Sequence, residues 1–339
     1  MPAARAQARL EPARLIALCN AIGTECADQT GYVAIPRLLA RFQTDVVLRP
    51  LLVEAMLAQI KKDQAVNETG WVVLVDNEKY PVSAVDIEQD SRTRPLPDRL
   101  RNTIAHELAH SLAYRHTEFG LVLDTQANTR ADGHDFVDAV EKAVEQASPA
   151  LLFPDSSVKD ALSALKKSVT AADLDRIRRQ HGISRYVLIN SLTRVCHPTH
   201  ASNLRDHASL YNVAIGLGEW IPNGDAIIRK WPLLANFPQG HFPAWIRQLA
   251  QRDQAKFSEI IPQWHRYVAN HDGGPVEFSI PEKTSSDEML PVRMSVERSG
   301  SRPGYRFLFA VNVEITAPWQ KLSVSTRQRP EDILAKFRS

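Results

Sequence analysis

Two histidines and a glutamate stand in a pattern that can bind a divalent metal ion, in the stretch His106-Glu107-Leu108-Ala109-His110. Residues four apart on a helix share one face, so His106 and His110 can present imidazole nitrogens to the same ion. Glu107 is rotated by about 100° around the helix, so it can reach a metal-bound water without acting as a ligand. Zinc lowers the pKa of such a water to about 7, and a carboxylate can accept its proton during attack on a peptide carbonyl. The pattern therefore predicts zinc-dependent hydrolysis, with Glu107 as the base.

The neighbouring residues favour a metal site over incidental histidines on a solvated helix. A helix is expected from Asp98, which stands where an N-cap residue would, to about Tyr114. Unpaired imidazoles in a buried setting are costly, so buried histidines need partners. The residues around the two histidines are mostly apolar: Ile104, Ala105, Leu108, Ala109 and Leu112.

A catalytic zinc site needs a third protein ligand, and several residues can supply it. His116 does not fit the continuation His-x-x-Gly-x-x-His, because SLAYRH after the second histidine contains no glycine. Glu141 and Glu145 fall on the next expected helix, at about 135–147, where a carboxylate can face the first helix. The candidates are His116, Asp124, His134, Asp135, Asp138, Glu141 and Glu145.

Two stretches resemble the ImmA/IrrE family of metallopeptidases, bacterial proteins that cleave transcriptional repressors. They are TIAHELAH and EKAVEQASPALLFP, and the resemblance covers roughly residues 70–195. It places Glu141 on the ligand position of the family, Glu145 on the position of an asparagine, and residues 151–154 on an LLMP-like tetrapeptide. Two carboxylates thus share one helix face, so either can be the third ligand, and the resemblance favours Glu141.

This chain departs from the family pattern at several positions. Phe153 replaces a methionine, and Pro149 interrupts the run of small residues. Arg101-Asn102 stands where an Arg-Phe pair is common. These departures limit the resemblance, while the two histidines and Glu107 keep the pattern.

The resemblance implies a zinc metalloendopeptidase of the HExxH type. His106, His110 and Glu141 would hold Zn²⁺, and Mn²⁺ or Fe²⁺ can occupy the same ligands. The implied substrate is a bacterial transcriptional repressor or a similar regulatory protein, and its cleavage would relieve repression during a stress response or phage challenge.

A helix-turn-helix unit is expected at 156–196, because Gly182-Ile183-Ser184 forms a turn between two helical patterns. The unit carries a basic cluster that could contact phosphates. Its members are Arg176, Arg178, Arg179, His181, Arg185 and Arg194. The alternative function is therefore a DNA-binding transcriptional regulator with a non-catalytic metal site; the structural alternative is a helical support with a solvated basic face.

Composition predicts a globular protein with no general attraction to nucleic acid or membranes. Of 339 residues, 44% are hydrophobic and 24% charged, with a net charge of +2, so DNA binding would need a local patch. Three cysteines fit a reducing compartment. No apolar run approaches the roughly 18 residues of a membrane span. We therefore expect a cytoplasmic protein without membrane contact.

The expected fold is α+β and predominantly helical, in three parts: a zincin-like metallopeptidase domain at 1–155, the helix-turn-helix unit at 156–196, and an α+β C-terminal domain, sensor-like, at 200–320. Residues 1–65 and 204–270 read as helical, and LLFP at 151–154 as an extended turn. A strand at 71–75 is expected to pair with an extended substrate. Further strands are expected at 276–280, 290–297 and 305–315, the last two as a hairpin.

Overall fold

The computed structural model divides into two compact units that both combine helices with strands, which confirms the α+β class. The first unit is Met1–Ala164 with Asp175–Val195, and the second is Leu165–Leu174 with Cys196–Ser339. Among the described helices, none has the length and apolar character needed to cross a bilayer. The structure describes residues 12–51, 58–62, 71–115, 132–165, 169–195, 213–230, 255–261, 264–269, 276–283, 289–297 and 303–313.

The first unit contains a three-stranded sheet in the order β1-β3-β2. Strand β3 (Trp71–Val75) is rich in β-branched residues and largely buried, as expected for a central strand. It pairs in parallel with β1 (Asp45–Leu48) and antiparallel with β2 (Ala58–Lys62). The prediction that 71–75 receives a substrate strand is therefore wrong, because both edges of β3 are already paired. The helical interpretation of 1–65 is likewise wrong at β1 and β2.

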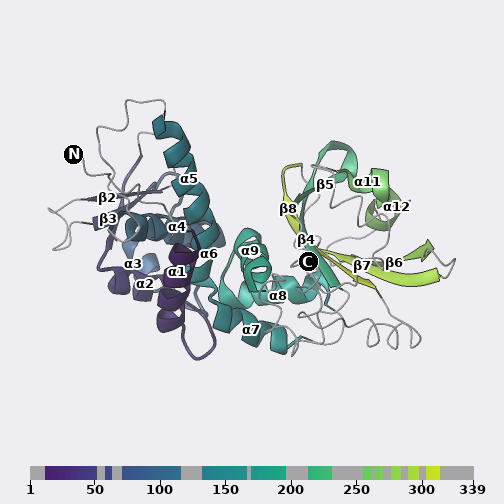
Figure 1. Ribbon diagram of the computed structural model, residues 1–339, viewed down its shortest axis with the longest axis horizontal. Coiled ribbons are helices and arrows are strands. Elements are labelled where there is room, and N and C mark those ends of the chain that lie inside the picture. Colours follow the sequence, from purple (N-terminus) through teal and green to yellow (C-terminus); the bar gives the residue numbers. More distant parts are fainter. Residues whose placement is uncertain are drawn as a thin grey trace, which may run out of the picture. The chain divides into compact units, whose positions relative to one another are not determined.

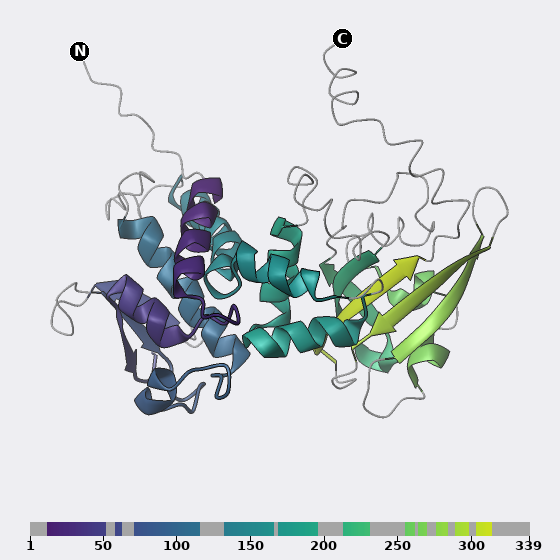
Figure 2. The ribbon, with the colours of Figure 1, turned by 90° about the horizontal axis from the view of Figure 1, so that it is seen from below.

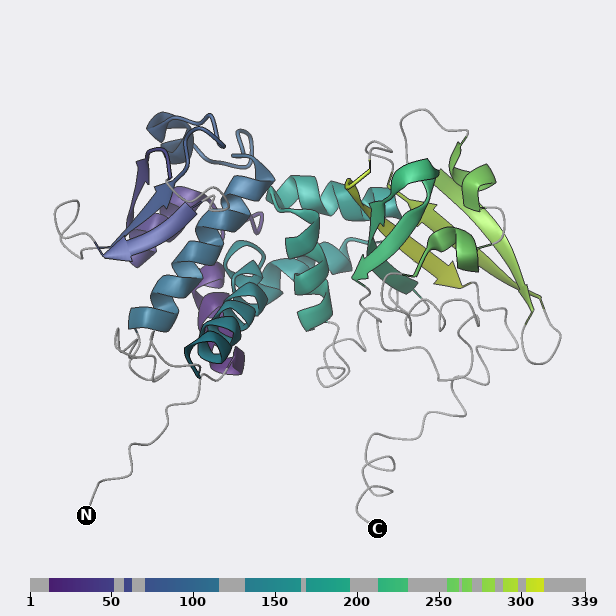
Figure 3. The ribbon, with the colours of Figure 1, turned by 90° about the horizontal axis from the view of Figure 1, so that it is seen from above.

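Helices pack beside this sheet (Figure 1). Figure 3 shows the sheet on one side of α4 (Asp98–Arg115), with α1 (Pro12–Cys26) and α5 (Asp132–Ala147) on the other side. One short helix, α3 (Ala84–Glu88), starts with a reciprocal capping box between Ser83 and Asp86. The described helices between residues 12 and 195 are α1 (Pro12–Cys26), α2 (Ile35–Phe42), α3 (Ala84–Glu88), α4 (Asp98–Arg115), α5 (Asp132–Ala147), α6 (Pro149–Leu152), α7 (Asp155–Ser163), α8 (Ala171–His181) and α9 (Arg185–Val195).

The helix that carries the histidine pattern lies in the core of the first unit. Helix α4 begins at Asp98, whose negative charge suits the positive end of the helix dipole. It packs against β2 and β3 and against α1, α5 and α6. The apolar residues that surround the histidines are buried: Ile104, Ala105, Leu108, Ala109 and Leu112.

The predicted turn between α8 and α9 is confirmed in detail. Gly182 has a φ of +57°, a conformation that side chains rarely adopt. The Ser184 hydroxyl accepts a hydrogen bond from the Val187 amide at 3.2 Å, so it caps α9. The segment LLFP was predicted to be extended, but α6 covers its two leucines, and both are fully buried. Of the segment expected to form the helix-turn-helix unit, residues 156–164 and 175–195 belong to the first unit.

The second unit is built on a five-stranded antiparallel sheet in the order β5-β4-β8-β7-β6. Figure 2 shows β6, β7 and β8, coloured green to yellow, as neighbouring strands. The three predicted strands and their hairpin are confirmed, but the helical interpretation of 204–270 is wrong at β4 and β5. The strands are β4 (Val213–Trp220), β5 (Ala226–Lys230), β6 (Val276–Lys283), β7 (Met289–Val296) and β8 (Arg306–Val313).

A cluster of aromatic side chains forms the core of this second unit. Short helices η5 (Pro222–Gly224), α11 (Phe257–Ile260) and α12 (Trp264–Ala269) accompany the sheet. Phe309 pairs with Gly216 across β8 and β4, and its buried ring occupies the space that a side chain on Gly216 would need. Phe257 contacts this ring edge to face, with 5.3 Å between the ring centroids.

Candidate metal centre

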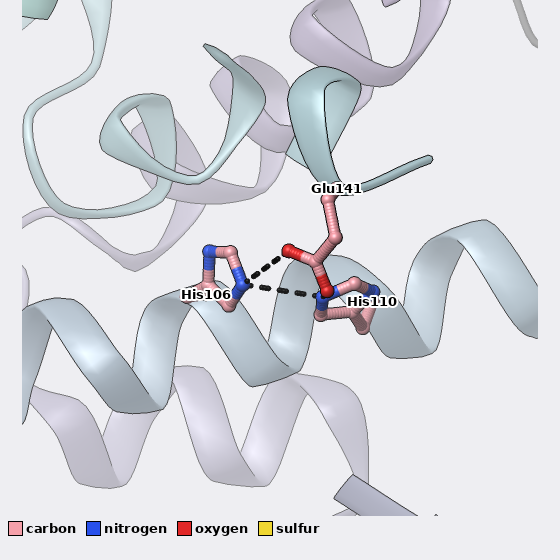
Figure 4. Close-up of side chains that lie close together, drawn as sticks. All are labelled: His106, His110 and Glu141. Atoms are coloured by element: carbon pink, nitrogen blue, oxygen red, sulfur yellow. Dashed lines mark hydrogen bonds and ion pairs between the residues drawn. The ribbon is translucent and has the colours of Figure 1, made fainter. Parts of the chain in front are cut away.

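Helices α4 and α5 bring three potential ligands to one point. Figure 4 shows Glu141 reaching from α5 toward the imidazole rings of His106 and His110 on α4. The two histidines lie one helical turn apart, so their rings project from the same face. Within the part of the chain that the structure describes, these three residues form a group whose ligand atoms all lie within 4.8 Å of one another.

The contacts among these three side chains are close to the separation between neighbouring ligands of one metal ion. The two Nε2 atoms of His106 and His110 are 3.2 Å apart. The carboxylate oxygens of Glu141 lie 3.3 Å from His106 Nε2 and 3.1 Å from His110 Nε2. Zinc bonds of about 2.0–2.2 Å at tetrahedral angles place neighbouring ligand atoms about 3.3–3.5 Å apart. The two Glu141 contacts involve different carboxylate oxygens, and with one ligand atom per residue all separations stay within 4.8 Å. The donor set therefore suits a divalent ion, with an adjustment of the carboxylate.

The three side chains differ in exposure, so the site is held firmly on one side and open to solvent on the other. The His110 side chain is 7% exposed, that of His106 24% and that of Glu141 48%. A buried imidazole keeps its orientation through packing, whereas the more exposed carboxylate leaves water access to the cluster. A hydrolytic site needs this combination, because water must reach it while the ligands stay fixed.

The cluster attracts positive charge. Hydrogen bonding with His106, and then with His110, holds the pKa of Glu141 far below its usual range. Burial lowers the pKa of His106, but the hydrogen bond with Glu141 and the charges of nearby carboxylates outweigh burial, so the pKa ends above its usual value. A divalent cation competes with protons for such a cluster, so metal binding should release protons.

Glu107 lies beside this group but is held elsewhere. Its Oε2 accepts a hydrogen bond from the main-chain amide of Ile60 in β2, at 2.9 Å. Burial raises the pKa of Glu107, with His110 and His106 opposing the rise. A carboxyl group whose pKa moves toward neutrality suits general acid–base chemistry.

The other candidates for the third ligand are separated by position. Glu145 is exposed one turn further along α5 and does not belong to the converging group. His116 and Asp124 lie outside the described residues. Helix α5 includes His134, Asp135 and Asp138, but their side chains also lie outside the described part.

A buried ion pair stabilises α4 about one and a half turns before His106. Arg101 is fully buried and forms an ion pair with Asp90. Its guanidinium also donates to the Gly182 carbonyl at 2.7 Å and to the Val33 carbonyl at 2.6 Å. In the sequence, Arg101 stands out only as the first member of an Arg-Phe pair whose second member is Asn102 here, and neither this network nor the role of the Ile60 amide was predicted. A main-chain amide carries no signal in residue type, and a lone arginine does not reveal its partners.

Three side chains of the basic cluster form hydrogen bonds or ion pairs with other residues of the first unit. Arg178 is buried and paired with Asp98 and Asp175. His181 is buried too, and its Nδ1 lies 3.1 Å from the Gly31 carbonyl. The largely buried Arg194 pairs with the Asp155 carboxylate at 2.7 Å and donates to the Phe153 carbonyl at 2.9 Å. These three side chains therefore support the helical packing, and they are not displayed for phosphate contacts.

Comparison with known proteins assigns no family. No protein-family model matches the chain, and no curated protein matches it. One solved structure with a similar course is a Mycobacterium tuberculosis transcriptional regulator. It is 14% identical, with a TM-score of 0.46, over 93% of this chain and 92% of that chain. A likeness at this level carries no functional argument.

Proposed function

We propose that this protein is a zinc-dependent endopeptidase with a zincin-like core. The observation that carries the proposal is the convergence of two imidazole nitrogens and one carboxylate at 3.1, 3.2 and 3.3 Å, on two packed helices. His106, His110 and Glu141 would hold the ion. Mn²⁺ and Fe²⁺ accept the same donor types and are the alternatives to Zn²⁺.

The residues around the ion would divide the chemistry between them. A bound divalent ion supplies Lewis acidity, which polarises a carbonyl and makes water acidic near neutral pH. Glu107 accepts the proton of the attacking water and delivers it to the departing amine. The buried His110 and the braced helix α4 fix the directions from which the ligands approach. This division gives Glu107 a role in turnover and none in metal binding.

An extended polypeptide is the substrate class that suits the surroundings. Strand β2 lies at an edge of the described sheet, and its Ile60 amide reaches Glu107. A peptide lying along this edge would pass beside the base, which suits cleavage within a chain. The resemblance to the ImmA/IrrE peptidases makes a bacterial repressor the proposed protein substrate, cleaved in a stress response.

Three conservative variants test the proposal. We expect Glu107→Gln to keep one zinc per chain and to lose cleavage of fluorescently labelled casein. Glu141→Gln should weaken zinc binding by about 100-fold or more, because a carboxylate ligand is lost. The matched control is Glu145→Gln, which makes the same change one turn along α5 and should keep zinc affinity within about threefold.

Metal content, zinc titration calorimetry and casein cleavage read out these variants. Chelation should abolish wild-type cleavage, and zinc should restore it. If Glu107→Gln cleaves casein as fast as wild type, or if Glu141→Gln binds zinc as tightly, the peptidase assignment is wrong. Duplex-DNA binding by a zinc-loaded protein without cleavage would instead support the regulator alternative.

A further inference from the structure

The main-chain amide of Ile60 connects the edge of the sheet to the candidate base. Successive N–H groups in an antiparallel strand point alternately toward and away from the neighbouring strand. Ile60 lies opposite Val73, and its N–H donates to Glu107 at 2.9 Å, so this group points away from β3. The N–H and C=O of one residue face the same side of an antiparallel ladder. The Ile60 carbonyl therefore also faces the outer edge of β2.

The outward N–H and C=O of Ile60 are the groups with which an added antiparallel strand would pair. Among the described strands, β3 is the only one that pairs with β2. A peptide that adds to the outer edge would donate to the Ile60 carbonyl and accept from the Ile60 N–H. The N–H that such a peptide needs is the one that Glu107 already occupies. Peptide and carboxylate must therefore compete for it.

We propose that an extended polypeptide bound along β2 takes over the Ile60 N–H and so releases Glu107. The inference rests on the proposed peptidase function and adds a substrate-dependent control to it. In the free protein the amide holds the carboxylate of the base. A small molecule without an extended main chain leaves that hydrogen bond intact, whereas a docked peptide replaces it. The base then becomes free only when a polypeptide is present.

Hydrogen exchange tests the hold on Glu107 in metal-free protein. We expect Glu107→Ala to speed exchange of the Ile60 amide by about tenfold or more, because a charge-assisted hydrogen bond is lost. The amide of Lys61 faces β3 and serves as the internal control, with unchanged exchange. Equal Ile60 exchange rates in wild type and variant would overturn the inference.

Peptide binding tests the competition. The probe is an acetylated hexapeptide amide of alternating threonine and valine, which favours an extended chain, titrated by NMR into metal-free protein. We expect Glu107→Ala to bind it about tenfold more tightly than wild type, because no carboxylate has to be displaced, and to regain slow Ile60 exchange on saturation. The matched control is Glu145→Ala, which should bind like wild type.

Different results would contradict the competition for the Ile60 amide and the peptidase function. Equal peptide affinity in wild type and Glu107→Ala, or no slowing of Ile60 exchange at any peptide concentration, overturns the competition while zinc-dependent casein cleavage stands. Loss of the peptidase function appears instead as no zinc-dependent cleavage of casein by wild type, whatever the exchange rates are, and the inference then falls with it.

Discussion

Replacing Arg101 by methionine should destabilise the first unit more than any change on the surface of α4. Methionine keeps an unbranched chain of similar length, so the space stays filled while the charge and the donors disappear. The Asp90 carboxylate then remains buried without its cation. The carbonyls of Val33 and Gly182 also lose the donor that they share.

The size of the effect follows from what remains around Asp90. Removing one partner of a buried ion pair costs about 3–5 kcal/mol. Asp90 keeps hydrogen bonds from the Tyr32 hydroxyl at 2.9 Å and from the amides of Ile35 at 2.8 Å and Leu96 at 2.9 Å. These donors moderate the loss, so we expect about 4 kcal/mol for Arg101→Met. For a unit of this size the midpoint of thermal unfolding should fall by roughly 8–16 °C.

Urea unfolding followed by circular dichroism measures the loss, and hydrogen exchange of α4 peptides assigns it to the first unit. The control Arg99→Met changes an exposed arginine on the same helix and should stay within about 0.5 kcal/mol of wild type. Adding Asp90→Asn to Arg101→Met should recover roughly 1–2 kcal/mol, because the unpaired charge is removed. A loss below about 1 kcal/mol for Arg101→Met, or no recovery in the double variant, would refute the reasoning.

Two further predictions concern the second unit and the pH response. Gly216→Val should cost about 1–3 kcal/mol, because a Cβ there would lie 2.1 Å from Cζ of the buried Phe309 ring; thermal unfolding with and without Phe309→Leu checks it, and a Gly216→Val midpoint like wild type would contradict it. Burial lowers the pKa of His181, opposed by its hydrogen bond with Gly31, so the unfolded chain binds the proton more readily. His181 therefore makes wild type lose stability as the pH falls below about 6.5, and His181→Gln should show a shallower decline in midpoint between pH 7.5 and 5.5; parallel curves would count against this cause.

The sequence predicted those elements whose pattern is local. Helices α4, α5, α8 and α9 carry apolar residues at helical spacing, Asp98 marks the start of α4, and β3 is a compact run of β-branched residues. Strands β4 and β2 were missed because their stability depends on their partners. Gly216 weakens β4 in isolation and becomes favourable only when the Phe309 ring lies over it. Ile60 in β2 fitted a helical stripe equally well, until pairing with β3 decided the outcome.

In the candidate site, too, the residues set by local spacing were predictable, and those set by packing between elements were not. The spacing of His106 and His110 determines their common face, so sequence alone could predict that they converge. The choice between Glu141 and Glu145 depends on how α5 packs against α4, which no local pattern encodes; the resemblance favoured the residue that the structure places beside the histidines. The Ile60 amide was beyond prediction, because every residue except proline offers the same group.

The hydrogen bond from Arg101 to the Gly182 carbonyl bears on how this protein can be dissected. A truncated fragment that ends after α6 would leave the buried Arg101 Nε without its acceptor, the Gly182 carbonyl. Asp98 would also lose its ion pair with Arg178. Laboratories that want a minimal fragment should therefore retain the chain through Val195. Replacing α8 and α9 by a different pair of helices should therefore destabilise α4, because the Gly182 carbonyl at their turn accepts the hydrogen bond from Arg101.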